Sequence, residues 1–223
     1  MRSPRHASRS GFTLIELMVV LAVIAVLLFI AAPSFREVLD VQRVRGVGDQ
    51  FITDVQFARS EAAGRQEAVG ISFRPPNATM TCYTIHTCGS RSFNTCTCDC
   101  TAAAGGRCPA PSVLEPDPPR EIRTVQLALS GGVRLDPVLN NGNPVAASAA
   151  TTHVSFDPAT GGLSVSYPTG ITVGPVPPNN QFWARSSSTV SGTATAIRHV
   201  VATTGRPSNC KPTGSTVKGL APC

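Results

Sequence analysis

Eight cysteines are the residues of this chain with the most evident chemistry. Six of them crowd between positions 82 and 108, and the other two lie near the C-terminus. Clustered thiols form disulfides in an oxidising compartment, whereas in a reducing one they bind a soft metal such as Zn²⁺. The compartment therefore decides how the cysteines are interpreted. They are Cys82, Cys88, Cys96, Cys98, Cys100, Cys108, Cys210 and Cys223.

Groups for catalysis are sparse. The four histidines are scattered, and no nucleophile motif, phosphate-binding loop or H-E-x-x-H zinc motif occurs in the sequence. His153 and His199 are expected on strands as polar or half-buried side chains, and Asp157 is expected to cap its own turn. The chain is therefore predicted not to be an enzyme and to use no cofactor.

The N-terminal region contains one near-continuous apolar run, from Phe12 to Ala32. As a helix its 21 residues extend about 31 Å, which is enough to cross the ~30 Å hydrocarbon core of a bilayer. Arg2, Arg5 and Arg9 precede the run and place residues 1–11 on the cytoplasmic side. The sequence thus predicts a single-pass membrane protein whose C-terminal part lies in an oxidising space.

Glu16 lies near the start of this apolar run and needs a partner, because a carboxylate in hydrocarbon costs ~2.5–3.5 kcal/mol. If the chain is cut between Gly11 and Phe12, the new amino group lies about one helical turn before Glu16, on the same face. The alternative is a secretory signal peptide removed after the run, but Ile30-Ala31-Ala32-Pro33 is a poor site for such cleavage.

The segment Ser10-Gly11-Phe12-Thr13-Leu14-Ile15-Glu16-Leu17, with the apolar helix and Pro33 after it, resembles the class III signal of type IV pilins and type II secretion pseudopilins. The resemblance implies that a prepilin peptidase cuts after Gly11 and methylates the amine of Phe12. It also implies that Glu16 guides docking of the subunit into a filament. The implied partners are the prepilin peptidase, other pilin or pseudopilin subunits and the bacterial inner membrane, with the head in the periplasm.

The elements that follow predict an α+β fold, with a long helix packed on an antiparallel sheet. Apolar residues recur at helical spacing up to Gly64, where the helix is expected to end, and the pattern then changes to period two. A long polar loop around Pro168–Pro178 is expected before the last strand. The apolar stripe is Phe35, Val38, Val41, Val44, Val47, Phe51, Val55, Ala58 and Ala62; the predicted strands are 68–73, 81–85, 121–129, 133–135, 153–156, 163–167 and 196–202.

These patterns divide the chain into five parts. They are a leader that is cleaved (1–11), a transmembrane helix (12–34), its amphipathic continuation (35–64), a head (65–209) with a Cys-rich insertion (82–108), and a basic C-terminal tail (210–223).

An extracytoplasmic head favours disulfides for the eight cysteines, without fixing their connectivity. Cys210–Cys223 is a suggested pair, because both lie apart from the other six. The metal alternative places Cys96, Cys98 and Cys100 on one strand face, with Cys88, Cys108 or His86 completing a Zn²⁺ site. The paired C-x₂-C spacing typical of such sites is missing, so no metal is predicted.

A second resemblance is to the GspH/FimT branch of minor pilins. It rests on Val154-Ser155-Phe156-Asp157-Pro158 and on the stretch from Arg198 to Gly205-Arg206, which precedes Cys210. It implies a minor pilin or pseudopilin that assembles into or primes a filament. The alternative that it implies is a FimT-like subunit that binds DNA, although Ser208 replaces the second Arg of the Gly-Arg-x-Arg motif.

The distribution of charge in the sequence is compatible with both filament assembly and DNA binding. The formal net charge is +6, of which three belong to the predicted leader, and no acidic residue follows Asp157. The basic C-terminal part offers phosphate contacts, with a merely solvated surface as the plainer interpretation. The candidate DNA contacts are Arg198, Arg206, Lys211 and Lys218.

Overall fold

A computed structural model describes residues 11–74, 79–91, 96–111, 117–145, 151–167 and 180–223, without the side chains of 31–34 and 193. The chain divides into two units, Met1–Leu39 and Asp40–Cys223, which are treated separately below. Helix α1 (Leu14–Arg65) runs through both and ends one residue beyond the predicted Gly64. Pro33 lies within this helix, and the predicted loop around Pro168–Pro178 falls outside the described residues.

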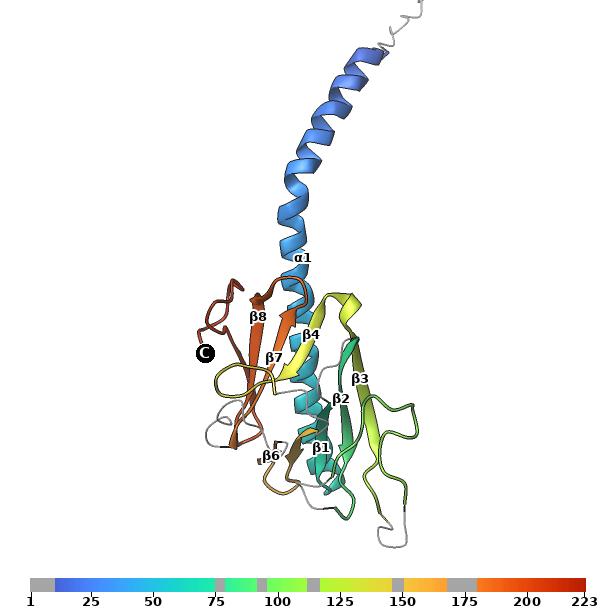
Figure 1. Cartoon of the computed structure of the whole chain (residues 1–223), viewed down its shortest axis with the longest axis vertical. Helices are drawn as coiled ribbons and strands as arrows, with labels where there is room; N and C mark the ends of the chain where they lie inside the picture. Colours follow the sequence, from blue (N-terminus) through green and yellow to red (C-terminus); the bar gives the residue numbers. More distant parts are fainter. Residues whose placement is uncertain (1–10, 75–78, 92–95, 112–116, 146–150, 168–179) are drawn as a thin grey trace, which may run out of the picture. The chain divides into compact units, whose positions relative to one another are not determined.

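In the described part of the head, nine strands form two antiparallel sheets (Figure 1). The first sheet has the order β3-β2-β1-β5-β6 and the second the order β4-β7-β8-β9. This confirms the predicted long helix followed by antiparallel strands. The strands are β1 (Val69–Arg74), β2 (Met80–Thr87), β3 (Glu121–Ala128), β4 (Val133–Pro137), β5 (Thr152–Phe156), β6 (Leu163–Ser166), β7 (Phe182–Ser188), β8 (Gly192–Val201) and β9 (Pro207–Cys210); a 3₁₀ turn, η1 (Leu129–Gly131), joins β3 to β4.

Two strands were not expected from the sequence. The sequence predicted no strand between residues 167 and 196, and this was wrong at β7, which pairs with both β4 and β8. The last strand is β9 rather than β8, since the turn before Pro207 folds the chain back onto β8. Serine-rich β7 and the four-residue β9 lack the β-branched residues that mark strands, so their pairing depends on the neighbouring strands.

Within the head, the part of α1 after Asp40 buries its apolar face against both sheets. Phe51 lies at the centre, with its ring centroid 5.8 Å from those of Phe73 and Tyr83 in the first sheet and 6.4 Å from that of Phe182 in the second. The predicted stripe is buried at Val44, Phe51, Val55, Ala58 and Ala62 and half-buried at Val41 and Val47, whereas Phe35 and Val38, in the N-terminal unit, are exposed.

A buried carboxylate also joins the helix to the first sheet. Asp54 accepts a hydrogen bond from the hydroxyl of Tyr83 at 2.6 Å and pairs with Nη1 of Arg123 at 2.7 Å. Burial, followed by these hydrogen-bonded and charged contacts with Asp54, raises the pKa of Tyr83 far above its ordinary value. The phenol therefore stays neutral and acts as a donor.

The basic tail belongs to the head rather than extending from it. Val217 is buried in a small apolar cluster with Val44, Val133 and Ile197. The Ser215 hydroxyl donates to the carbonyl of Ala196, and Arg45 on the helix donates to the carbonyl of Lys218 at 2.5 Å. The tail is thus fixed to β8 and to the helix.

The head imposes opposite requirements on two helical glycines. A Cβ on Gly48 would lie 2.5 Å from Cε1 of His199 and 3.3 Å from Oγ of Ser186, whereas one on Gly46 meets nothing within 4 Å. We expect Gly48→Ala to lower the free energy of unfolding by about 1–3 kcal/mol through overpacking. Gly46→Ala, the matched control, should raise it by roughly 0.5–1 kcal/mol. Urea unfolding of the full chain in detergent micelles measures both, and equal effects would contradict this packing.

Candidate functional site

The candidate assembly site lies at the start of α1. Thr13 precedes the first helical residue, and its hydroxyl oxygen accepts a hydrogen bond from the backbone N–H of Glu16 at 3.3 Å. The N–H of Leu17 donates to the Thr13 carbonyl at 3.2 Å. Thr13 is therefore an N-cap, and the acid lies in the first turn of the helix. Gly11 and Phe12 immediately precede this cap and are exposed.

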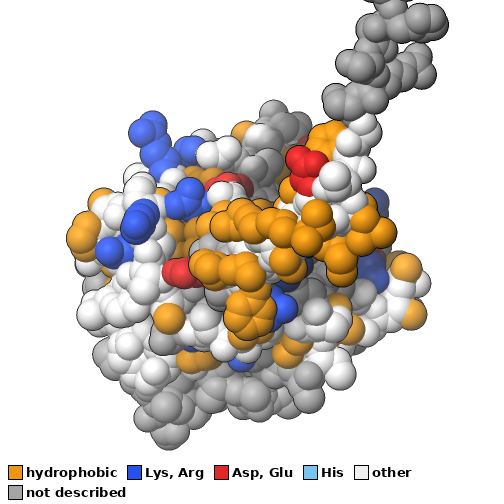
Figure 2. Space-filling model, turned by 90° about the horizontal axis from the view of Figure 1, so that it is seen from above, with side chains coloured by type: hydrophobic (Ala, Val, Ile, Leu, Met, Phe, Trp, Pro, Cys, Tyr) orange, Lys and Arg blue, Asp and Glu red, His pale blue; other side chains and the backbone are white. Residues whose placement is uncertain are grey.

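The N-terminal unit presents an apolar surface. Of the large hydrophobic side chains that are exposed in the described part of the chain, all but Phe57 and Val190 lie between Phe12 and Leu39. Apolar side chains form a band in the view from above (Figure 2). Among the described residues, no single helix has the length and hydropathy required of a membrane span. Leu14–Ile30 and Phe35–Arg65 meet that requirement only as a bent pair, and only on length and composition.

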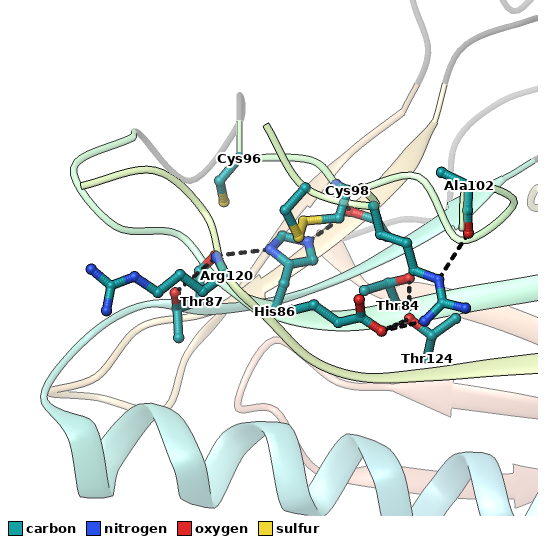
Figure 3. Close-up of a disulfide and its surroundings, with 12 residues drawn as sticks. Thr84, His86, Thr87, Cys96, Cys98, Ala102, Arg120 and Thr124 are labelled. Carbon is teal, nitrogen blue, oxygen red and sulfur yellow. Dashed lines mark hydrogen bonds and ion pairs between the residues drawn. A yellow bond between two sulfur atoms is a disulfide. The ribbon is translucent and has the colours of Figure 1, made fainter. Parts of the chain in front are cut away.

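The cysteines pair within two parts of the head. The structure joins Cys82–Cys100, Cys88–Cys96, Cys98–Cys108 and Cys210–Cys223. The last is the pair suggested by sequence position. Cys82–Cys100 and Cys88–Cys96 fix the segment 96–108 over the face of the first sheet that points away from the helix, and Cys98–Cys108 closes a loop within the segment. Figure 3 shows Cys96 and Cys98 of this segment near His86.

Polar contacts hold the same segment on the sheet. The Cys98 N–H donates to Oγ of Ser72, and Nε2 of Gln126 donates to the Cys100 carbonyl. Arg74 pairs with Asp99, and this contact lowers the pKa of the Asp99 carboxyl to about 2. Both faces of β1 are consequently covered, which explains why its first five residues are all buried.

Three histidines lie inside the head, so the expectation that His153 and His199 are half-buried was wrong. His86, His153 and His199 are all essentially inaccessible to solvent. Burial lowers the pKa of His86 and of His199 to about 4. The described structure places His199 between the Ser186 hydroxyl, 2.9 Å from Nε2, and the Asn209 amide oxygen, 2.7 Å from Nδ1. Both nitrogens are therefore used with a neutral ring.

The His199 site predicts a loss of stability in mild acid. The pKa of His199 in the folded protein, about 4, lies below the ordinary 6.5. Between these two pH values the imidazole is therefore protonated in the unfolded chain but neutral in the folded one. The contribution of His199 to the free energy of unfolding is fully present above pH 6.5. It is lost as the pH falls toward 4, by about 3 kcal/mol in total. Urea unfolding between pH 7.5 and 4 measures the decline.

The control for this prediction is His199→Gln, whose stability should fall less steeply over the same window. The comparison removes the contributions of other groups. Among them is Asp136, whose pKa is raised by burial and which therefore acts in the opposite sense. Equal slopes for the two proteins would contradict the assignment.

The structure separates the four candidate DNA contacts. Arg198 lies on the outer face of β8, with its guanidinium carbon 4.8 Å from the centroid of the Trp183 ring. Arg206 lies in the turn between β8 and β9 and lines a pocket of about 610 Å³ that also contains Arg59. The backbone of Lys211 forms an isolated β-bridge with that of Pro222, and Lys218 is exposed.

Arg185 and Trp183 are neighbours of Arg198 that sequence reasoning did not select. Arg185 is directly opposite Arg198 in the register of β7 and β8, and its Nη1 donates to the Gly142 carbonyl at 2.8 Å. Burial lowers the pKa of both guanidinium groups. An alternation of Trp183, Arg185 and Ser187 was visible in the sequence, but only the recognition of β7 would have placed it beside Arg198.

Comparison with known proteins bears on the N-terminal segment. Residues 6–32 match the model of the prokaryotic N-terminal methylation motif. Neither a curated protein nor a solved structure matches the chain significantly. The matched residues include Gly11, Phe12 and Glu16, which the structure places at the start of an exposed apolar helix. This motif indicates a type IV pilin-like protein, a structural subunit anchored in a membrane.

Proposed function

We propose that the chain is a minor pilin or pseudopilin of the GspH/FimT type, which assembles into or primes a type II secretion pseudopilus or a type IV pilus. The observation that carries this proposal is the methylation motif at the capped start of an apolar helix. The proposed locations are the bacterial inner membrane for residues 12–34 and the periplasm for the head.

The apolar surface of the N-terminal unit supports a packed location. Phe12 is 85% exposed and Phe29 is 83% exposed in the isolated chain. Burying each such side chain is worth about 1.5–3 kcal/mol, so eighteen of them represent a driving force of tens of kcal/mol. Either a bilayer or a bundle of similar helices would bury these apolar side chains. A filament subunit is buried first in the bilayer and then in the helical bundle of the filament.

The cap supports cleavage after Gly11. The cap itself lies within the chain that remains after cleavage, because the N–H of Glu16 bonds to the Thr13 side chain. Removing residues 1–11 therefore leaves the helix start intact. It also adds an amino group close to the positive end of the helix dipole, where the Glu16 carboxylate offsets the charge.

The mature N-terminus tests this proposal. The full chain is co-expressed with a prepilin peptidase, and the product is examined by N-terminal sequencing and intact-mass measurement. We expect a chain that begins at Phe12 and carries one methyl group. Gly11→Val should remain uncut and Ser10→Ala should be cut normally. A first residue beyond Ala32, or an uncut wild-type chain, would overturn the proposal.

The alternative that we propose is DNA binding by the head, and it rests on the outer face of β7 and β8. Arg198 and Arg185 are neighbours there, and the Arg198 guanidinium lies over the Trp183 ring, so this face places two cationic groups beside an aromatic ring. A gel-shift titration of the full chain in micelles at two salt concentrations tests it. Binding should weaken with salt and fall in Arg198→Ala, with Arg120→Ala, an exposed arginine elsewhere, as the control. Binding that is independent of salt or unchanged in Arg198→Ala would reject this alternative.

A further inference from the structure

A polar cluster lies behind the first sheet, on the face that the segment 96–108 covers. The register of β1 places Ser72 opposite His153 on β5 and Gly70 opposite His86 on β2. The two imidazole rings stack with centroids 5.4 Å apart. A Cβ on Gly70 would collide with both rings, so the strand leaves space for them by having no side chain there.

Hydrogen bonds fix the orientation of these rings. Nδ1 of His86 lies 3.0 Å from the Thr87 carbonyl, which can only accept, so this nitrogen carries the hydrogen. In the neutral ring Nε2 of His86 then accepts from the Ser72 hydroxyl at 2.7 Å. The Ser72 oxygen in turn accepts from Nδ1 of His153 at 3.2 Å.

The consequence of this order falls on the other nitrogen of His153. With hydrogen on Nδ1, the lone pair of Nε2 faces Sγ of Cys96, which is 3.3 Å away. A histidine whose Nδ1–H is held by a second group, while Nε2 is directed at a sulfur ligand, has the orientation of a metal-binding imidazole.

The third group of the site is Cys88. Its sulfur, the Cys96 sulfur and a ring nitrogen of His153 all lie within 4.8 Å of one another, and all three residues are buried. Tetrahedral Zn²⁺ with Zn–S of about 2.3 Å and Zn–N of about 2.0 Å holds its ligand atoms roughly 3.3–3.8 Å apart, so the two sulfurs, which are bonded to each other in the oxidised protein, must move apart on reduction. The structure shows the two sulfurs joined as a disulfide, which is the alternative use of the same atoms.

We propose that Cys88, Cys96 and His153 form a binding site for a thiophilic divalent cation of the Zn²⁺ class whenever the two cysteines are reduced. Such thiols exist in every newly made chain before oxidation. The cation displaces one proton from each thiol, bonds to both sulfurs and to Nε2 of His153, and takes water as its fourth ligand. No electron is transferred. Ser72 is a positioning residue, because it holds Nδ1 of His153.

This site differs from the metal alternative that the sequence offered. That alternative grouped Cys96 with Cys98 and Cys100, and completed the site with Cys88, Cys108 or His86. The structure places its three central cysteines in three different disulfides, whereas Cys88 and Cys96 share one. The metal and the Cys88–Cys96 disulfide exclude each other, so a bound cation delays formation of that disulfide alone.

Titration with Co²⁺, a spectroscopic probe for Zn²⁺ sites, tests the proposal on the full chain in micelles with a phosphine reductant. We expect one Co²⁺ per chain, thiolate-to-cobalt charge-transfer absorption, and displacement by one equivalent of Zn²⁺. Cys88→Ser with Cys96→Ser should abolish the absorption, whereas Cys98→Ser with Cys108→Ser should retain it. Ser72→Ala should weaken binding by about 10–100-fold.

X-ray absorption of the reduced wild-type protein with bound Zn²⁺ guards against variants that fail to fold. The expected shell contains two sulfurs and one imidazole nitrogen. Absence of binding, a shell of four sulfurs, or binding that persists without Cys88 and Cys96 would overturn the proposal. So would equal binding by the oxidised protein.

Discussion

Replacing Glu16 with alanine is expected to leave membrane insertion and leader removal intact and to reduce incorporation into filaments by at least about tenfold. The carboxylate lies in the first turn of an exposed apolar helix, one turn after the proposed new terminus. Inside a helical bundle, a terminal amine without its acid is an unpaired charge in an apolar environment. Breaking such a pair costs roughly 3–5 kcal/mol, and 1.4 kcal/mol corresponds to a factor of ten.

The measurement is the ratio of subunit in sheared filaments to subunit in membranes. Glu37→Ala is the matched control, because Glu37 is an exposed acid on the same helix but lies outside the apolar run. It should assemble normally. If Glu16→Ala entered filaments at the wild-type ratio, the pairing of the acid with a neighbouring amine would be refuted, whatever the state of the leader.

The second large effect is expected in the head. Phe51→Ala should lower the free energy of unfolding by about 3–5 kcal/mol, since the ring is inaccessible to solvent and fills the space where the helix meets both sheets. Its edge-to-face contacts with Phe73, Tyr83 and His199 would be lost together. Because a domain is typically stable by 5–15 kcal/mol, the variant should be near its unfolding threshold.

Urea unfolding in micelles, followed by far-ultraviolet circular dichroism, measures this loss. Phe57→Ala provides the comparison, because Phe57 lies on the same helix and is 36% exposed. Its cost should stay below about 1.5 kcal/mol, because less apolar area is removed from the core. Similar losses in the two variants would mean that the aromatic cluster is not the centre of the core.

The helix was predictable because two independent patterns mark it. The motif around Glu16 defines its start, and the stripe from Val41 to Ala62 defines the face that the sheets cover. Strands such as β1 and β5 were visible as runs of alternating apolar residues. β7 was not visible, because Ser186, Ser187 and Ser188 are buried by the surrounding structure rather than by their own hydrophobicity.

The surroundings of the histidines were beyond sequence reasoning. The space beside His199 exists because Gly48 and Ser186 are small, and these residues lie on separate elements far apart in the chain. The cluster of Ser72, His86 and His153 depends likewise on the register of three strands. The disulfide partners depend on how the segment 96–108 folds over β1 and β2, which its own sequence does not specify.

The four disulfides have one further consequence, which concerns biogenesis. Their sequence separations are 18, 8, 10 and 13 residues, so every pair is made within a short stretch of chain. Short loops close with little entropic penalty. A polypeptide emerging from a translocon can therefore be oxidised stepwise as it exits. Three pairs are available once Cys108 has emerged, and the fourth becomes available once Cys223 has emerged.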